Sequence, residues 1–198
     1  MIQRKTKWKT KDKRQKMIKN EKVKESTVKE STVKESKKPK ILNPLMLTTR
    51  FTTETFQENK RYRDTHNIPC IYSSSLPISD KLPYQDYYVL EMNNSTNRIM
   101  GIGKISKTLQ PIAYIYSYKY YNRYTYKGTY APIAYSKDSE LILPEHNDII
   151  TRIERKIFYG KGHLKRGSSF TSFPVYPHEE DIADLILIFN YIMRANLT

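Results

Sequence analysis

The fold is decided by residues 87–105, YYVLEMNNSTNRIMGIGKI. Its first part, Tyr87–Met92, is β-branched and aromatic, which is typical of a strand. Asn93–Asn97 has the composition of a turn. The rest, Arg98–Ile105, alternates so that Ile99, Gly101, Gly103 and Ile105 share one side of a second strand. The stretch therefore predicts a β-hairpin, the clearest in the chain.

Further strands are predicted on both sides of this hairpin. Upstream, Thr53–Arg63 is expected to form a short helix and Pro69–Tyr72 a short buried strand. Downstream, Ile112–Tyr126 reads IAYIYSYKYYNRYTY and alternates at a strand period, with a turn at Asn122-Arg123. The alternating tyrosines of this stretch are expected to pack in the core; they are Tyr114, Tyr116, Tyr118 and Tyr120.

Two helices are predicted towards the C-terminus. Glu145–Tyr159 carries a stripe of isoleucines between Pro144 and Gly160. His178–Ala195 has apolar residues at helical spacing and an acidic first turn, where the helix dipole favours negative charge. Strands followed by helices predict an α+β class, with a small curved sheet or barrel flanked by two or three helices.

Charge divides the chain into two parts. The whole sequence of 198 residues carries a formal charge of +15, and residues 1–40 hold 16 Lys+Arg against 5 Asp+Glu, so +11 of it lies there. This segment repeats VKEST and has almost nothing to bury, which predicts a disordered basic arm. Residues 41–198 are expected to form a single domain. Lys37–Lys40 also resembles a nuclear localisation patch.

Composition excludes several classes of protein. No apolar run approaches the roughly 20 residues of a membrane span, and no secretory leader is evident. One cysteine, Cys70, and four histidines leave little material for a disulfide or a zinc site. We expect no cofactor, no membrane partner and a reducing intracellular location.

Candidate catalytic groups are few. His66 and Cys70 are separated by Asn67-Ile68-Pro69, so no helix brings them together, and a buried cysteine is usually inert. Two acidic sets could bind a divalent metal for phosphodiester cleavage; they are Asp86 with Glu91, and Glu145 with His146 and Asp148. Each has a plainer interpretation: Asp148 as a helix-dipole partner, and Glu91 as a cross-strand ion pair with Arg98. The sequence predicts no enzyme.

A basic glycine-rich loop is the most informative functional motif. Residues 160–169, GKGHLKRGSS, combine three glycines with cations and hydroxyls. Glycines let backbone N–H groups approach an anion, and the side chains add charge and donors, as a phosphate-binding loop requires. The predicted nucleic-acid-binding residues here are Lys161, His163, Lys165, Arg166 and Ser168. A solvated surface loop is the alternative, and the spacing is not that of a Walker A motif.

Tyrosines supply a second candidate surface. Seven of the 17 tyrosines lie between Tyr114 and Tyr126, close to Lys119, Arg123 and Lys127. Aromatic rings stack on bases while neighbouring cations hold phosphates. Arg123, Tyr121 and Tyr124 are therefore predicted as secondary nucleic-acid contacts.

Three segments resemble an uncharacterised protein family of large DNA viruses: residues 87–106, 118–128 and 156–171, of which GHLKRG is the most specific. This resemblance implies a location in the host cytoplasm or nucleus, or in the virion. The strand–turn–strand ending in MGIGKI is also loosely similar to PUA-like domains, including the EVE and YTH types. That resemblance implies a small PUA-like barrel that binds nucleic acid. The YTH pocket depends on tryptophans, whereas the only one here, Trp8, is in the arm, so a methyl-base cage is not implied.

Together these features predict a non-catalytic protein that binds RNA or DNA. The loop at 160–169 would grip phosphates and the arm would add non-specific affinity. Two other hypotheses stay open: a structural or virion-associated protein that binds viral proteins, and a metal-dependent nuclease.

Overall fold

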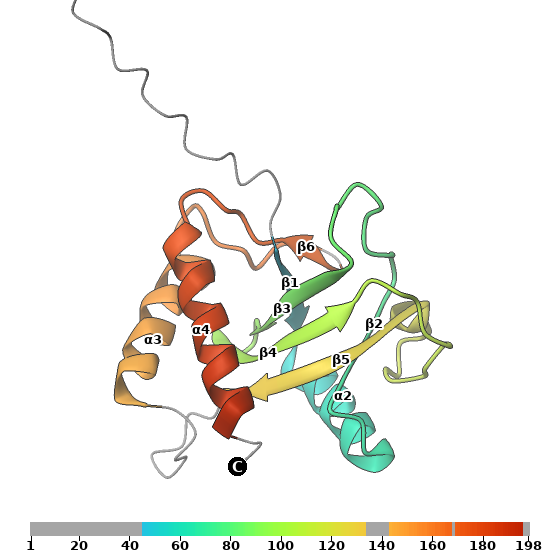
Figure 1. The fold of residues 1–198 in the computed structure, drawn as a ribbon. Helices are drawn as coiled ribbons and strands as arrows, with labels where there is room; N and C mark the ends of the chain where they lie inside the picture. Colours follow the sequence, from blue (N-terminus) through green and yellow to red (C-terminus); the bar gives the residue numbers. More distant parts are fainter. Residues whose placement is uncertain (1–44, 134–142, 168, 196–198) are drawn as a thin grey trace, which may run out of the picture. The chain divides into compact units, whose positions relative to one another are not determined.

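A curled six-stranded sheet organises the part of the chain that the computed structural model describes, namely residues 45–133, 143–167 and 169–195 (Figure 1). The predicted arm, residues 1–40, lies outside these ranges. The strands are β1 Met46–Phe51, β2 Cys70–Ser74, β3 Asp86–Asn93, β4 Arg98–Ser106, β5 Tyr124–Pro132 and β6 Thr171–Ser172. The helices are α2 Thr53–His66, α3 Pro144–Phe158 and α4 Glu179–Ala195, with a 3₁₀ turn η1 at Lys119–Asn122.

The sheet is mixed, in the order β2-β5-β4-β3-β1-β6. β1 runs parallel to β3, and the other pairs are antiparallel. The α+β class, the curved sheet and the three flanking helices are as predicted. No described helix is both long and apolar enough to cross a bilayer.

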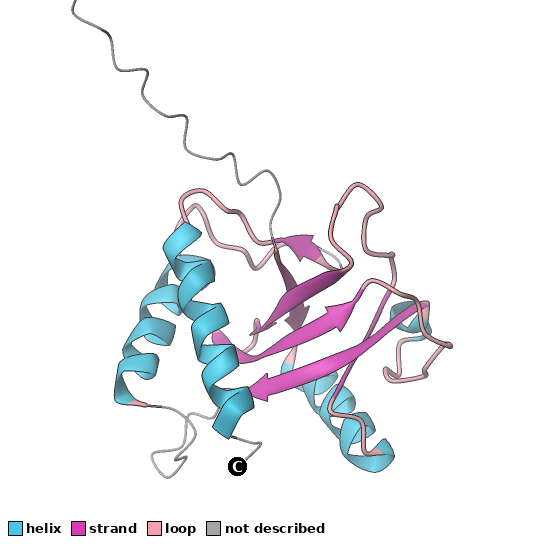
Figure 2. Cartoon of the chain, in the orientation of Figure 1, coloured by secondary structure: helices cyan, strands magenta, loops and turns pink. Residues whose placement is uncertain are grey.

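Each face of the sheet has its own core. α3 and α4 lie side by side over one face, and α2 packs at the opposite side (Figure 2). Successive residues of β3 point to opposite faces, so Leu90 and Met92 join the α3–α4 core while Tyr87 and Val89 join the other. A strand buried on both faces reads as a continuous apolar run, which is why residues 87–92 stand out in the sequence.

The predicted hairpin is confirmed, but the prediction that Ile99 and Ile105 share one face of its second strand is wrong. Met92 pairs with Ile99 and Glu91 with Gly101, so Met100 is an extra residue in β4. A bulge of this kind reverses the alternation beyond it. Ile99 consequently packs in the α3–α4 core, whereas Ile105 packs in the core on the opposite face.

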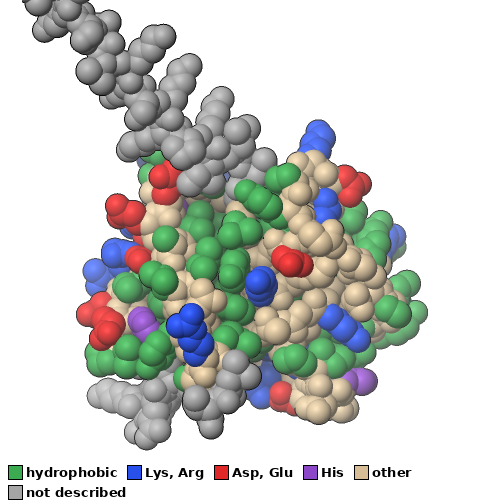
Figure 3. Space-filling view, viewed as in Figure 1, with side chains coloured by type: hydrophobic (Ala, Val, Ile, Leu, Met, Phe, Trp, Pro, Cys, Tyr) green, Lys and Arg blue, Asp and Glu red, His purple; other side chains and the backbone are tan. Residues whose placement is uncertain are grey.

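The stretch 112–126 was predicted as a tyrosine-rich strand, but its first part is a loop that leads into η1, and only its end, from Tyr124, belongs to a strand. Its alternation is opposite to the prediction, since Ala113 and Ile115 are buried while Tyr114 is 77% exposed. The Asn122 side chain accepts N–H bonds from Ile115 and Tyr116, each at 3.0 Å, and so replaces the ladder of a neighbouring strand. Core packing is therefore wrong for Tyr114, Tyr118 and Tyr120; of the predicted set Tyr116 alone is buried. Hydrophobic side chains gather over this loop at the right edge of Figure 3.

The two C-terminal helices match their predicted ranges closely, and a polar network joins them. Asp181, in the first turn of α4, is buried and contacts His178 Nδ1 and Lys156 Nζ of α3, each at 2.9 Å. β1 was not predicted, because its sequence MLTTRF shows no regular alternation: three apolar residues flank the polar run Thr48-Thr49-Arg50. Its parallel pairing with β3, from Met46↔Tyr88 to Phe51↔Asn93, forms it.

Candidate nucleic-acid interface

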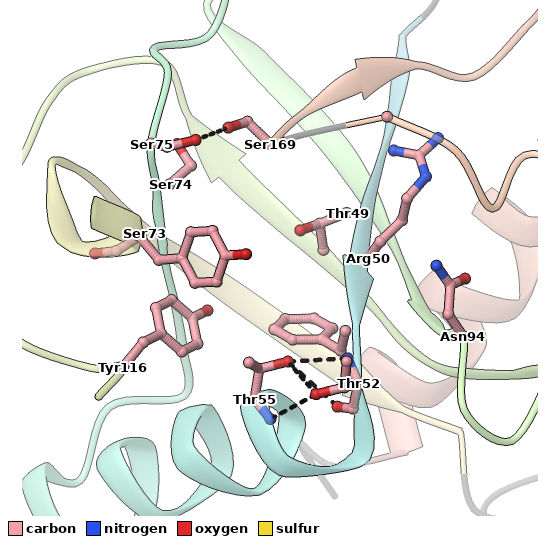
Figure 4. A pocket seen from close by; sticks show the side chains of 13 residues that line it. Thr49, Arg50, Thr52, Thr55, Ser73, Ser74, Ser75, Asn94, Tyr116 and Ser169 are labelled. Atoms are coloured by element: carbon pink, nitrogen blue, oxygen red, sulfur yellow. Dashed lines mark hydrogen bonds between the residues drawn. The ribbon is translucent and has the colours of Figure 1, made fainter. Parts of the chain in front are cut away.

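A hydroxyl-rich cavity of about 260 Å³ opens beside the end of β1 (Figure 4). It is lined by Thr49, Arg50, Phe51, Thr52, Thr55, Ser73, Ser74, Ser75, Asn94, Tyr116, Tyr121, Gly167 and Ser169. Seven of these carry a serine or threonine hydroxyl, and one is an arginine. None of the described lining residues is an aspartate or glutamate, so the cavity has no fixed negative charge.

Local chain geometry places the N-terminus of α2 at this cavity. β1 ends at Phe51, and Thr52 caps the helix in a reciprocal arrangement with Thr55. Thr55 N donates to Thr52 Oγ1 at 3.2 Å, and Thr52 N donates to Thr55 Oγ1 at 2.9 Å. The positive end of a helix dipole therefore lies at the wall, where it favours a bound anion.

Arg50 is the cation among the described lining residues, and its side chain extends from the side of β1 opposite to Thr49, toward Gly167 (Figure 4). Its side chain is half-buried; Nε donates to the Leu164 carbonyl at 2.5 Å and Nη1 to Thr171 Oγ1 at 2.7 Å. A guanidinium carries more N–H donors than these two bonds use. Burial lowers the pKa of Arg50 from its ordinary value, yet an arginine stays charged. No carboxylate in the described part of the chain forms an ion pair with it.

The glycine loop lies against the same cavity. Gly167, at φ 126°, sits so close to Arg50 that a Cβ would lie 3.3 Å from Nη1, and Gly160 also has a positive φ. Ser169 lines the cavity and bonds to Ser75 Oγ at 2.9 Å. Glycine at 167 thus permits both the backbone conformation and the close approach to the guanidinium.

The predicted cations of this loop differ in their surroundings. Lys161 and Arg166 are exposed, whereas Lys165 is half-buried and donates to Asn97 Oδ1 at 2.8 Å. His163 Nδ1 accepts the N–H of Lys165 at 3.3 Å. Across residues 45–133, 143–167 and 169–195, no ion pair neutralises the three lysine and arginine side chains. Ser168 lies outside the described residues.

The turn between β3 and β4 fixes the loop in place. Asn94 Nδ2 donates to the Lys165 carbonyl at 3.0 Å, and Asn94 itself lines the cavity. Its Oδ1 is buried without a hydrogen-bond partner. The predicted turn and the predicted loop, about 70 residues apart in sequence, are thus neighbours in the fold.

The predicted tyrosine contacts are only partly brought together. Tyr121 lines the cavity beside Tyr116 and remains 43% exposed. Arg123 is exposed and lies over the Tyr120 ring, with its guanidinium carbon 5.0 Å from the centroid, but it does not line the cavity. Tyr124 begins β5, is half-buried and packs against the α2-side core.

Sequence reasoning missed most of the cavity. Arg50, Asn94 and the serines of β2 come from segments that the fold alone assembles. One signal was present: the Thr52–Thr55 pair, although it lacks the Glu or Gln of the usual capping box. Arg50 gave none, because β1 itself was not predicted.

Glu91 forms a buried polar cluster and not the predicted cross-strand pair with Arg98. Tyr72 and Tyr130 each donate a hydroxyl bond of 2.8 Å to its carboxylate, and Arg63 Nη1 lies 3.8 Å from Oε1. Arg98 instead pairs with Glu154 at 3.0 Å. Burial raises the pKa of Glu91, although the Arg63 charge opposes the shift.

The other candidate catalytic groups are separated. Burial, together with the Glu91 charge, raises the pKa of Cys70 to about 12, so its thiol stays protonated. His66 is exposed and stacks on Tyr62 at 4.0 Å between centroids. His146 packs edge-on against Tyr191. Among the described residues, no three His, Cys, Asp or Glu side chains are placed to hold a metal ion.

Comparison of the chain with protein-family models, with curated proteins and with solved structures gave no match in any of the three. The chemistry of the cavity and of the adjoining loop therefore carries the functional argument.

Proposed function

We propose that the protein binds nucleic acid without catalysis, through the hydroxyl-rich cavity and the glycine loop beside it. The resemblance to a viral family and to PUA-like domains belongs to this same proposal and rests on the sequence segments alone. The observation that carries it is Arg50, a lining residue whose half-buried guanidinium lies beside Gly167 and has no carboxylate partner among the described residues. Burying a cation is costly unless an anion compensates it, and a phosphate is such an anion.

The surroundings of Arg50 fit a phosphate-bearing ligand. The α2 N-terminus lies at the cavity wall, and the exposed cation Arg166 directly precedes the lining residue Gly167, so both add positive potential there. Lys161 is a second exposed cation of the same loop. The serine and threonine hydroxyls both donate and accept hydrogen bonds, as sugar and base edges require. Pockets for drug-sized ligands measure roughly 300–1,000 Å³, so a cavity of about 260 Å³ suits one small group, such as a single base or a phosphorylated sugar.

The basic arm makes a separate, non-specific contribution to the affinity for nucleic acid. Its +11 charge attracts any polyanion by counterion release and reads no sequence. The folded part would then set the register of the bound strand, because positioned side chains hold individual phosphates.

The test uses a full-length background in which the arm's lysines and arginines are glutamine. In it, Lys161→Glu with Arg166→Glu should weaken binding of a labelled oligonucleotide by roughly tenfold or more, since each charged hydrogen bond contributes about 1.5–3 kcal/mol. The slope of log affinity against log salt should fall by about 0.7–0.9 for each phosphate that the variant no longer binds. Fluorescence anisotropy across a salt series measures both.

Arg61→Glu with Lys81→Glu is the matched control, since both are exposed cations outside the cavity lining and the charge change is the same. It should change affinity much less than the loop variant. Equal losses of affinity in the two variants would indicate a general charge effect, and unchanged binding in the loop variant would overturn the proposal.

A further inference from the structure

The loop between β4 and β5 displays aromatic rings to solvent. Tyr118 is 57% and Tyr120 is 56% exposed, and Tyr114 is more exposed still. Figure 3 shows the hydrophobic surface that gathers over this loop. A contiguous exposed aromatic patch on a folded protein commonly marks a binding surface.

These rings form a connected series that ends in the cavity. The Tyr118 centroid lies 5.4 Å from that of Tyr120 and 5.0 Å from that of Tyr121. Tyr121 in turn contacts Tyr116 edge-on at 6.1 Å, and both of these residues line the cavity. The patch and the candidate phosphate site are thus continuous, with Tyr121 as the link.

The loop is held in this conformation by hydrogen bonds, most of them buried. Asn122 accepts from the Ile115 and Tyr116 amides and donates to the Tyr116 carbonyl at 2.7 Å. Asn59 of α2 donates to the Tyr116 hydroxyl at 3.1 Å, and Glu58 accepts bonds from Ser117. Rings held in place before binding lose little conformational entropy when a ligand stacks on them.

A cation accompanies the rings. Arg123 lies over the Tyr120 ring at 5.0 Å and has no ion pair with a described carboxylate. Lys119, at the start of η1, is exposed beside it. Aromatic faces interleaved with cations suit a ligand that alternates flat bases with phosphates.

We infer that the ligand is a single strand, whose phosphates contact the glycine loop and Arg50 and whose unpaired bases stack on Tyr118 and Tyr120. The inference rests on the proposed function and specifies its substrate class. In a duplex the base faces are stacked on one another, so only an unpaired strand offers them to tyrosine rings. A duplex would leave the rings of Tyr118 and Tyr120 without exposed base faces to stack on.

The experiment compares single- and double-stranded oligonucleotides of one sequence, again in the full-length background with a neutral arm. Tyr118→Ala with Tyr120→Ala should weaken single-strand binding at least tenfold, since base–aromatic stacking is worth about 1–3 kcal/mol per base. Duplex binding, already weaker, should stay unchanged. The matched control is Tyr118→Phe with Tyr120→Phe, which keeps the rings and should retain affinity.

The outcomes separate this inference from the proposed function. The single-strand inference would be overturned if the protein preferred the duplex, or if the alanine variant lost equal affinity for both ligands. Phosphate binding is tested separately, by the loop variant Lys161→Glu with Arg166→Glu. A phenylalanine variant as weak as the alanine variant would also overturn the single-strand inference, because stacking does not need the hydroxyl. Circular dichroism checks that each variant is folded.

Discussion

Glu91 illustrates how a single buried residue constrains this fold. Its carboxylate is fully buried on β3, and its neighbours Arg63, Tyr72 and Tyr130 come from α2, β2 and β5. The Arg63 guanidinium also lies 4.1 Å above the Tyr130 ring. Because each partner belongs to a different element, the cluster connects α2, β2 and β5 to β3 around the Glu91–Arg63 charge pair.

We expect Glu91→Gln to lower the free energy of unfolding by about 3–5 kcal/mol, since it leaves the Arg63 charge buried without a counterion. Adding Arg63→Met should recover part of this stability, because the second change removes the unpaired charge. Urea unfolding of the wild type, both single variants and the double variant measures the coupling. A Glu91→Gln protein as stable as the wild type would contradict this assignment.

At the scale of elements, the β4–β5 pair depends on a close backbone approach. Gly128 of β5 pairs with Ile105, and a Cβ at this position would collide with the Lys104 carbonyl oxygen. Backbone cannot move aside as the end of a flexible side chain can. A side chain at 128 would therefore separate the two strands.

Gly128→Ala should accordingly destabilise the protein by about 3 kcal/mol, at the upper end of the range for overpacked sites. Gly162→Ala is the matched control: nothing lies within 4 Å of its Cβ position, so a change of less than about 0.5 kcal/mol is expected. Thermal unfolding of the two variants gives the comparison. Similar melting temperatures for both would show that the strands separate without cost.

For the molecule as a whole, the α3–α4 contact makes stability depend on pH. Although burial opposes the shift, bonds from His178 and Lys156 lower the pKa of Asp181 below its ordinary value. The native state then binds fewer protons than the unfolded state near that value, which is about 3.9. This contribution is complete above about pH 5 and disappears as the pH falls through the folded-state pKa.

Asp181→Asn should therefore lower stability at neutral pH and flatten the fall in stability below pH of about 5. Urea unfolding at a series of pH values checks both expectations. Asp184→Asn is a useful comparison, because Asp184 is more exposed and, among the described residues, forms an ion pair with Arg152 only. An acid slope unchanged by Asp181→Asn would assign the pH dependence to other carboxylates.

Local pattern was sufficient for several parts of this protein. The hairpin at 87–105, the helices α2, α3 and α4, and the α+β class follow from periodicity, turn residues and helix ends, which act over a few neighbouring residues. The cations of the glycine loop could likewise be named from sequence. Tertiary structure decided what depends on distant partners: the pairing that forms β1, the Met100 bulge that divides Ile99 from Ile105, and the Asn122 bonds that expose the tyrosines. It also brought Arg50 to the cavity, since a half-buried cation without a counterion is defined only by what surrounds it in space.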